Sequence, residues 1–301
     1  ARYLSWKYHV PMVFTYHTRY EQYLHYIGLS KLQGVMPAYI RSYTKHCDMV
    51  IAPTPLMKKY LEKVQPEADI RVLPTGLSKD NFMPEEEKAL CLRKTLAGGK
   101  RYLFCTVARL AKEKNLVFLL NSMKMLKDSW GSDFRLVLIG EGPQRPELEK
   151  RADKLGIRDE VCFAGKIPNQ EIKNYCHASD LFLFPSLSET QGIVLLESMA
   201  AGTPVLALRA TGTQDVVLNG ENGYMTDMSE KEFASKLIDI FEKKEIDLLR
   251  QGALETARCY SSVQIAKEAV LFYAQAVYNR KEKQQQKHGN GNRKKDMVYL
   301  G

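Results

Sequence analysis

Short apolar runs alternate with segments of helical periodicity along most of this chain. Five runs of strand length lie between residues 100 and 210, and a helical pattern follows each of them. The expected strands are Tyr102–Ala108, Arg135–Ile139, Val161–Ala164, Leu181–Pro185 and Pro204–Ala207. This alternation predicts a doubly wound parallel sheet. Because connections between parallel strands are right-handed, the carboxyl ends of the strands should share one edge, where such sheets bind ligands.

The first 78 residues show the same alternation over fewer strands. Val10–Tyr16 and Met49–Ala52 are expected strands, and Arg71–Leu73 leads into a Pro-Thr-Gly turn. We expect these residues to form the second half of an α/β domain, so that the chain is truncated at its N-terminus. The predicted organisation is a partial domain over 1–78, a linker over 79–99, a second domain over 100–260, a helix over 261–279 and a disordered basic tail over 280–301.

The composition is that of a globular protein of about two domains. The 301 residues are 45% hydrophobic and 10% aromatic, which excludes a disordered chain. No apolar run approaches the roughly 18 residues that a membrane span requires. The six cysteines are scattered without a C-x-x-C pair, which predicts reduced thiols and no metal site.

The formal net charge of +9 is concentrated at the two ends of the chain. Residues 1–50 carry +4 and residues 280–301 carry +5, so that residues 51–279 are neutral. We therefore expect no nucleic-acid partner, which would require a basic folded domain. Nine of the sixteen tyrosines lie in the first 60 residues, interleaved with basic side chains. This mixture predicts peripheral contact of residues 1–50 with an anionic membrane, with a solvated face as the alternative.

Arg109 and Lys114 follow the first strand of the second domain, with four residues between them. At the carboxyl end of a strand, both side chains should point toward the ligand-binding edge. A guanidinium binds two phosphate oxygens and an ammonium adds a point charge, so the pair suits a diphosphate. The alternative is a solvated charged loop in which Glu113 is the partner.

One carboxylate precedes the helix expected from about Ile193 to Ala201, and a second lies inside it. Gly192 lets a ligand approach the N–H groups at the N-terminus of this helix, which is an anion site. Glu189 would repel a phosphate there, so we expect it to face neutral hydroxyls. Glu197 lies inside the apolar helix, where a carboxylate needs hydrogen-bond donors, and a vicinal diol such as a ribose supplies two. The alternative is a core Glu197 satisfied by the backbone or a lysine.

Two further turns end expected strands and could line a base pocket, although most such turns are only turns. They are Gly140-Glu141-Gly142-Pro143 and Gly165-Lys166-Ile167-Pro168. The chain has no G-x-G-x-x-G, P-loop or D-x-D motif. This argues against a dinucleotide, ATP or a metal-bridged diphosphate, so we expect neither a cofactor nor a metal.

In combination, these motifs resemble family 4 of the retaining, GT-B-fold glycosyltransferases. The motifs are Arg109-x4-Lys114, Gly140-Glu141-Gly142-Pro143, Glu189-x7-Glu197 and Gly202-Thr203-Pro204-Val205. The resemblance covers roughly residues 10–280 and implies two Rossmann-like domains with parallel sheets, the N-terminal one incomplete. It implies an acceptor-side domain over 1–78, a nucleotide-sugar-binding domain over 100–260, and a helix over 261–279 that packs back toward the N-terminal domain.

The resemblance also implies a role for each candidate residue. Arg109 and Lys114 would hold the donor diphosphate together with N–H groups of Gln191, Gly192 and Ile193. Glu197 would bind the ribose, Glu189 the hydroxyls of the transferred sugar, and Gly140 and Ile167 would border the base. In Thr15-Tyr16-His17-Thr18, His17 would face the C6 hydroxyl and the reacting centre. Without the family, a lone histidine after an apolar strand is more often a core or surface residue.

Residues 16–26 further resemble the bacterial diacylglycerol glucosyltransferases. This narrower resemblance implies transfer of a hexose, most simply glucose from UDP-glucose, to diacylglycerol or glycosyl-diacylglycerol. It also implies a cytoplasmic enzyme at the inner face of the cell membrane. The alternatives are a relative with a soluble or polysaccharide acceptor, a GT-B sugar-nucleotide epimerase, and a non-catalytic nucleotide-sugar- or lipid-binding fragment. The E-x7-E arrangement argues against the epimerase.

Overall fold

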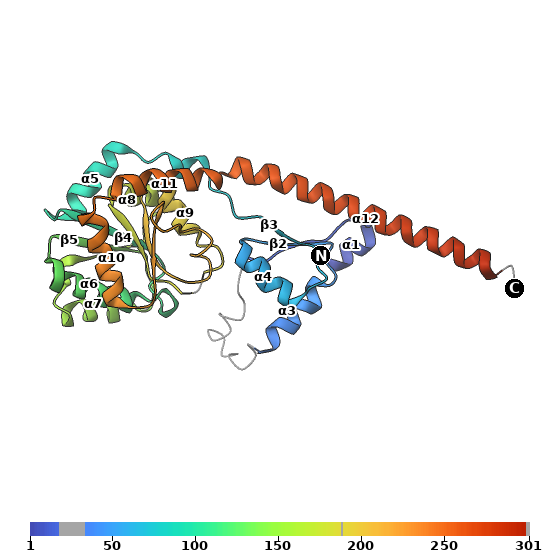
Figure 1. Cartoon of the computed structure of the whole chain (residues 1–301), viewed down its shortest axis with the longest axis horizontal. Helices are drawn as coiled ribbons and strands as arrows, with labels where there is room; N and C mark the ends of the chain where they lie inside the picture. The colour runs from blue at the N-terminus through green and yellow to red at the C-terminus, as the bar shows by residue number, and fades with distance from the viewer. Residues whose placement is uncertain (18–33, 188, 299–301) are drawn as a thin grey trace. The chain divides into compact units, whose positions relative to one another are not determined.

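The chain folds into two compact units, each built on its own parallel sheet (Figure 1). The computed structural model describes residues 1–17, 34–187 and 189–298, with side chains through residue 282. Unit 1 comprises residues 1–74 and 263–301, and unit 2 comprises residues 75–262.

Unit 2 contains a six-stranded parallel sheet with the order β6-β5-β4-β7-β8-β9. Its strands are β4 (Tyr102–Val107), β5 (Phe134–Ile139), β6 (Val161–Gly165), β7 (Leu181–Phe184), β8 (Val205–Leu208) and β9 (Gly223–Thr226). The five strands expected for this part of the chain are all present, and they pair in parallel. The direction of strand succession reverses between β4 and β7, which makes the loops after these two strands a ligand-binding switch point.

Strand β9 is the element of this sheet that the sequence did not predict. It is four residues long and begins at Gly223, a residue that weakens a strand pattern. The glycine is required because an added Cβ would lie 2.1 Å from the backbone oxygen of Val205 on β8. The close approach of β9 to β8 therefore requires a glycine, and that glycine interrupts the apolar pattern by which a strand is predicted.

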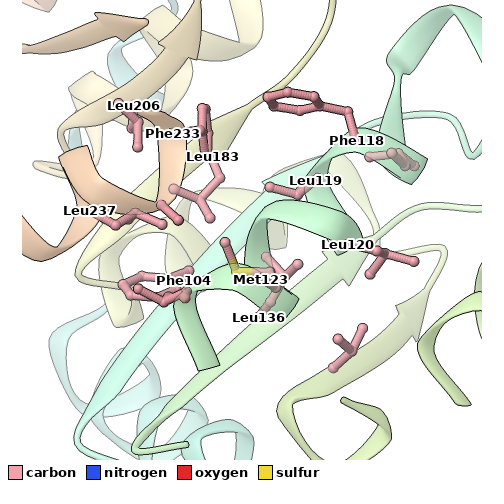
Figure 2. Packing of buried hydrophobic residues seen from close by; sticks show 14 of the residues in the cluster. Phe104, Phe118, Leu119, Leu120, Met123, Leu136, Leu183, Leu206, Phe233 and Leu237 are labelled. Atoms are coloured by element: carbon pink, nitrogen blue, oxygen red, sulfur yellow. The ribbon is translucent and has the colours of Figure 1, made fainter. Parts of the chain in front are cut away.

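Helices cover both faces of this sheet, which explains why its strands are continuous apolar runs. They are α5 (Glu86–Ala97), α6 (Leu116–Trp130), α7 (Arg145–Lys154), α8 (Asn169–Ala178), α9 (Ile193–Ala200), α10 (Glu230–Glu242) and α11 (Ile246–Cys259), with 3-10 turns η3 (Lys79–Phe82), η4 (Lys112–Lys114) and η5 (Arg158–Glu160). On one face, Phe104 of β4 packs in a cluster with Met123 of α6 and Phe233 of α10 (Figure 2). The neighbouring strand residue, Leu103, contributes to the cluster on the opposite face. Burial of each such side chain contributes about 1.5–3 kcal/mol.

The segment expected as a linker, residues 79–99, is instead an integral part of unit 2. Helix α5 spans most of it and packs against α8. Ala89 and Ala97 are buried in the cluster that also holds Leu103, and Leu92 and Leu96 pack against that cluster. The buried face of α5 is built largely from small alanines, which give only a weak apolar periodicity. The acidic residues of the first turn therefore make the segment look like a polar linker.

Unit 1 contains a three-stranded parallel sheet with the order β1-β2-β3. Its elements are α1 (Arg2–Tyr8), β1 (Val13–Thr15), α3 (Met36–Thr44), β2 (Met49–Ala52), α4 (Pro55–Val64), β3 (Ile70–Val72) and α12 (Ser262–Val298). Thr54 caps α4 by accepting a hydrogen bond from the Met57 backbone N–H at 3.2 Å. On the sheet, Ile51 and Leu73 form a small buried cluster with Ile265 of α12.

Helix α12 is longer than the sequence pattern suggests. The helix expected over 261–279 begins at Ser262, and its backbone continues to Val298 through the segment expected to be disordered. Lys, Arg and Gln dominate residues 280–288, and these residue types have favourable helix propensities without needing an apolar face. Within the part of the chain that the structure describes, no helix is both long and apolar enough to cross a membrane.

Candidate active site

Backbone hydrogen bonds join the loops after β4 and β5 to the carboxyl ends of the neighbouring strands in the unit 2 sheet. Ala108 donates to Ile139 at 3.0 Å and Leu110 donates to the Glu141 carbonyl at 3.0 Å, on either side of Arg109. Gly140 in turn donates to Gly165 at 2.8 Å. Arg109 therefore extends from a backbone segment that is held at two points, by the last residue of β5 and by the loop after it.

Two glycines allow these loops to approach each other so closely. A Cβ at Gly140 would lie 2.0 Å from the backbone oxygen of Ala108, and Gly140 also has a φ of +133°. A Cβ at Gly142 would lie 2.3 Å from the backbone oxygen of Leu110. Gly140 thus acts first of all on the position of the Arg109 loop, which the sequence analysis did not anticipate. Its expected place beside a nucleotide base stays a prediction.

Lys114 and Glu189 are brought into direct contact. Lys114 lies in η4 after β4, and Glu189 lies in the loop after the adjacent strand β7. The Lys114 ammonium forms an ion pair and hydrogen bond with Glu189 Oε1, and both side chains are 19% exposed. Ser186 Oγ donates to the same oxygen at 3.2 Å. The sequence analysis placed the two residues in one site but did not foresee this pairing, and it missed the contribution of Ser186.

The segment before α9 is held by its side chains and by tight packing. The Gln191 amide hydrogen-bonds to both backbone groups of Thr75, accepting from its N–H at 2.9 Å and donating to its carbonyl at 3.1 Å. Gly192 precedes α9 with a φ of +67°, and an added Cβ would lie 3.0 Å from the Gly212 carbonyl. Ile193 is the first residue of α9 and is exposed. The Gln191 side chain is thus used within the fold, which leaves backbone N–H groups to contact a donor.

Glu197 is a half-buried carboxylate that no protein group satisfies. It lies on α9 between Leu196 and Ser198, both fully buried. Among the described residues, none forms a hydrogen bond or ion pair with its side chain, so the alternative of a core glutamate satisfied by the backbone or a lysine is not met. Burial raises the pKa of the Glu197 carboxyl above its ordinary value. An unpaired, desolvated acceptor of this kind is suited to a ligand that brings hydrogen-bond donors.

The remaining candidates are distributed over both units. Ile167 lies two residues after β6 and packs against the buried cluster of one sheet face. His17 belongs to unit 1, is exposed, and follows β1 by two residues. Of the segment that resembles the diacylglycerol glucosyltransferases, residues 18–26 lie outside the described part of the chain. The role of His17 beside the unit 2 residues stays a prediction.

Family comparison identifies the class of protein to which this fold and these strand-end loops belong. The glycosyl transferases group 1 family matches residues 90–256, more than half of the chain, and glycosyltransferase family 4 matches residues 1–81. The chain belongs to the glycosyl transferases group 1 family. The resemblance inferred from the sequence motifs is thereby confirmed.

The curated relatives include two alpha-monoglucosyldiacylglycerol synthases. The chain is 34% identical over 206 residues to the alpha-monoglucosyldiacylglycerol synthase of Streptococcus pneumoniae, covering 66% of this chain and 46% of that protein. It is 27% identical over 284 residues to the Acholeplasma laidlawii enzyme of the same name, covering 89% and 70%. A third relative is the sulfoquinovosyl transferase SQD2 of Arabidopsis thaliana, 28% identical over 259 residues, with 83% and 49% covered. The chain thus spans about half the length of two of these relatives.

Solved structures establish the fold. HepE from Anabaena, in complex with UDP and glucose, matches 91% of this chain and 74% of its own with a TM-score of 0.75 and 19% identity. Sucrose-phosphate synthase from Thermosynechococcus elongatus matches 91% and 71% with a TM-score of 0.75 and 23% identity. These likenesses confirm the expected α/β GT-B fold with parallel sheets.

Proposed function

We propose that this chain is the catalytic part of a retaining glycosyltransferase that moves a hexose from a nucleotide sugar to a lipid acceptor. The donor is most simply UDP-glucose, and the acceptor is diacylglycerol or a glycosyl-diacylglycerol. The observation that carries the donor half of the proposal is the Glu197 carboxylate, which has no partner among the described residues and lies eight positions after Glu189. The names of the relatives, two of them alpha-monoglucosyldiacylglycerol synthases, support the acceptor half.

In the proposed mechanism, Arg109 and Lys114 bind the donor diphosphate, and the ribose hydroxyls donate to Glu197. Attack by the acceptor hydroxyl occurs on the face of the sugar from which the diphosphate departs. The leaving phosphate oxygen takes the acceptor proton, so no protein nucleophile is needed. Negative charge grows on the departing diphosphate in the transition state, where fixed cations and N–H groups stabilise it more than in the ground state.

The proposal is tested by a donor and acceptor screen with the chain. UDP-glucose, UDP-galactose and GDP-mannose are incubated with vesicles containing diacylglycerol or with soluble sugar acceptors, and products are identified by mass spectrometry. Transfer of glucose to the lipid supports the proposal. Transfer only to soluble sugars favours the alternative family member, and nucleotide-sugar binding without transfer favours a non-catalytic fragment.

Replacing Glu197 by glutamine should weaken donor binding and stabilise the fold at neutral pH. The raised pKa means that the Glu197 carboxyl stays protonated to a higher pH in the folded state than in the unfolded state. Ionisation of this group therefore lowers the free energy of unfolding. The penalty is absent at acid pH and grows as the pH rises through and above the ordinary carboxyl range. Glu197→Gln should therefore increase the free energy of unfolding at pH 7 by about 1 kcal/mol, but not at pH 4.

The measurements are urea denaturation at both pH values and calorimetric titration with UDP-glucose, for which we expect at least a tenfold loss of affinity, about 1.4 kcal/mol. Glu255→Gln is the matched control, because Glu255 is exposed on α11 and is contacted by Gln251. Unchanged donor affinity in Glu197→Gln would rule out the ribose-binding role.

We also propose that unit 1 contacts an anionic membrane through an aromatic surface on α1 and α3. We define this aromatic surface by its exposed rings, Tyr3, Trp6, Tyr8 and Tyr39, together with the exposed aliphatic side chain of Leu4. Trp6 is 69% exposed, and the Lys7 ammonium lies 5.8 Å and 5.4 Å from the ring centroids of Tyr3 and Tyr8. Amphipathic rings beside cations suit the interface of a bilayer that contains anionic lipids.

Membrane binding should depend on both components of this surface. The chain should co-sediment with vesicles containing phosphatidylglycerol and much less with pure phosphatidylcholine, because each basic residue near the surface contributes about 1 kcal/mol. Trp6→Ala with Lys7→Gln should reduce binding severalfold. Leu248→Ala, which removes an exposed apolar side chain from α11, should not change it. Binding that ignores anionic lipid content would reject this part of the proposal.

A further inference from the structure

The ion pair between Lys114 and Glu189 joins two residues that the proposed function assigns to different parts of the donor. Lys114 is needed for the diphosphate and Glu189 for the hydroxyls of the sugar. The structure instead shows Glu189 Oε1 receiving both the Lys114 ammonium and the Ser186 hydroxyl. These groups come from the loops after β4 and β7, which are adjacent strands of the sheet. In the structure, the two side chains satisfy each other.

A phosphate that binds Lys114 must either share the ammonium, which has three N–H donors, with Glu189 or displace the Glu189 carboxylate from it. With only 19% of each side chain exposed, water compensates the displaced carboxylate poorly. The carboxylate then lies beside a second anion, which adds repulsion. Binding of a diphosphate alone therefore carries a penalty that arises from Glu189.

The sugar of an intact donor removes this penalty. Its hydroxyl groups are neutral donors, and a charged acceptor forms stronger hydrogen bonds with them than a neutral acceptor would. Glu189 then exchanges its ammonium partner for hydroxyl partners, while Lys114 exchanges a carboxylate for a phosphate. With a sugar nucleotide both groups gain new partners, whereas with a free nucleoside diphosphate Glu189 keeps only the Ser186 hydroxyl.

We infer that Glu189 is a specificity-determining residue that makes the site prefer the sugar nucleotide over the free nucleoside diphosphate. This inference rests on the proposed function. Glu189 reclaims Lys114 once the sugar has left, and this contact promotes release of the nucleoside diphosphate product. The same contact limits product inhibition.

The test compares binding of UDP and UDP-glucose to the chain by calorimetric titration. Glu189→Gln keeps the size of the side chain but gives up most of the attraction for Lys114, so UDP should bind about tenfold more tightly, within the range of coupled neighbouring residues. UDP-glucose should bind no more tightly than it does to the unsubstituted chain, because its hydroxyls lose a charged acceptor. Glu171→Gln is the control, because this substitution removes the same charge elsewhere in unit 2. Glu171 lies on α8 and pairs with Lys88 at 2.5 Å.

A double-mutant cycle separates partner exchange from simple repulsion. If Glu189 acts by competing for Lys114, Glu189→Gln should tighten UDP binding less in a Lys114→Met background than in the unsubstituted chain. Thermal unfolding of the same four proteins without nucleotide should show a coupling between the two positions.

An equal or larger gain in UDP affinity in the Lys114→Met background, or equal tightening of UDP and UDP-glucose, overturns the inference. If the unsubstituted chain binds neither nucleotide, the proposed donor is wrong and the inference falls with it. If UDP-glucose binds but the selectivity is unchanged in Glu189→Gln, only the inference fails.

Discussion

Replacing Arg109 by alanine should lower the rate of glycosyl transfer by about a thousandfold, the effect expected when one fixed donor to a developing anion is lost. Arg109 lies between two backbone hydrogen bonds, one to the end of β5 and one to the loop after it, so its guanidinium is attached to a well-held segment. Turnover is measured with UDP-glucose and the best acceptor from the screen. The main loss should be in kcat, because the charge on the diphosphate is greatest in the transition state.

Two further variants make this result specific. Arg109→Lys should recover only part of the activity, since an ammonium keeps the charge but cannot bind two oxygens in a fork. Arg145→Ala removes a nearby guanidinium that pairs with Glu141 and Glu149, and it should leave turnover within a few fold of the unsubstituted protein. Near-normal turnover of Arg109→Ala, with thermal unfolding unchanged, would falsify the assignment of Arg109 to the donor diphosphate.

Replacing Gly140 by alanine should destabilise unit 2 by about 3 kcal/mol and weaken donor binding at the same time. The added Cβ would meet the Ala108 carbonyl at 2.0 Å, and the clash is with backbone rather than with a flexible side chain. Relief of that clash requires the loop that carries Arg109 to move away from β5. Urea denaturation and titration with UDP-glucose measure the two effects.

Gly131→Ala is the matched control for the effect of backbone conformation. Gly131 also has a positive φ, +91°, but no atom lies within 4 Å of an added Cβ. With a ψ of −171° its backbone lies in a region that is nearly closed to other residues, so its replacement should cost about 1–3 kcal/mol from conformation alone and should leave donor affinity unchanged. If Gly140→Ala weakens donor binding no more than Gly131→Ala does, the close approach of the two loops does not hold Arg109 in place.

The strands and the buried environment of Glu197 were predictable because they depend on local pattern. The continuous apolar runs of β4, β5 and β7 indicate strands that are covered on both faces, and the structure confirms this. The helix around Glu197 is apolar on nearly all sides, which predicts a desolvated carboxylate. The structure adds that no described residue satisfies this carboxylate, a fact that depends on every neighbouring element.

The contacts that organise the candidate site were not predictable from spacing. The Lys114–Glu189 ion pair joins residues 75 positions apart, and the Gln191–Thr75 hydrogen bonds join residues 116 positions apart. Both depend on which strands are neighbours and on how far each loop extends beyond its strand. The packing of α5 was hidden for a related reason, because its alanines become a buried face only when α8 lies against them.

The sequence by itself determined the alternation of strands and helices, the neutral middle with basic ends, and the motifs that mark a GT-B glycosyltransferase. These features are set by residue type and short-range periodicity, which the chain carries before it folds. Only the tertiary structure decided that Gly140 supports the Arg109 loop, that Lys114 pairs with Glu189, and that Glu197 has no protein partner among the described residues. The physical reason is that such contacts form between side chains and loops from distant parts of the chain, so they exist only once the sheet has brought its strand ends to one edge.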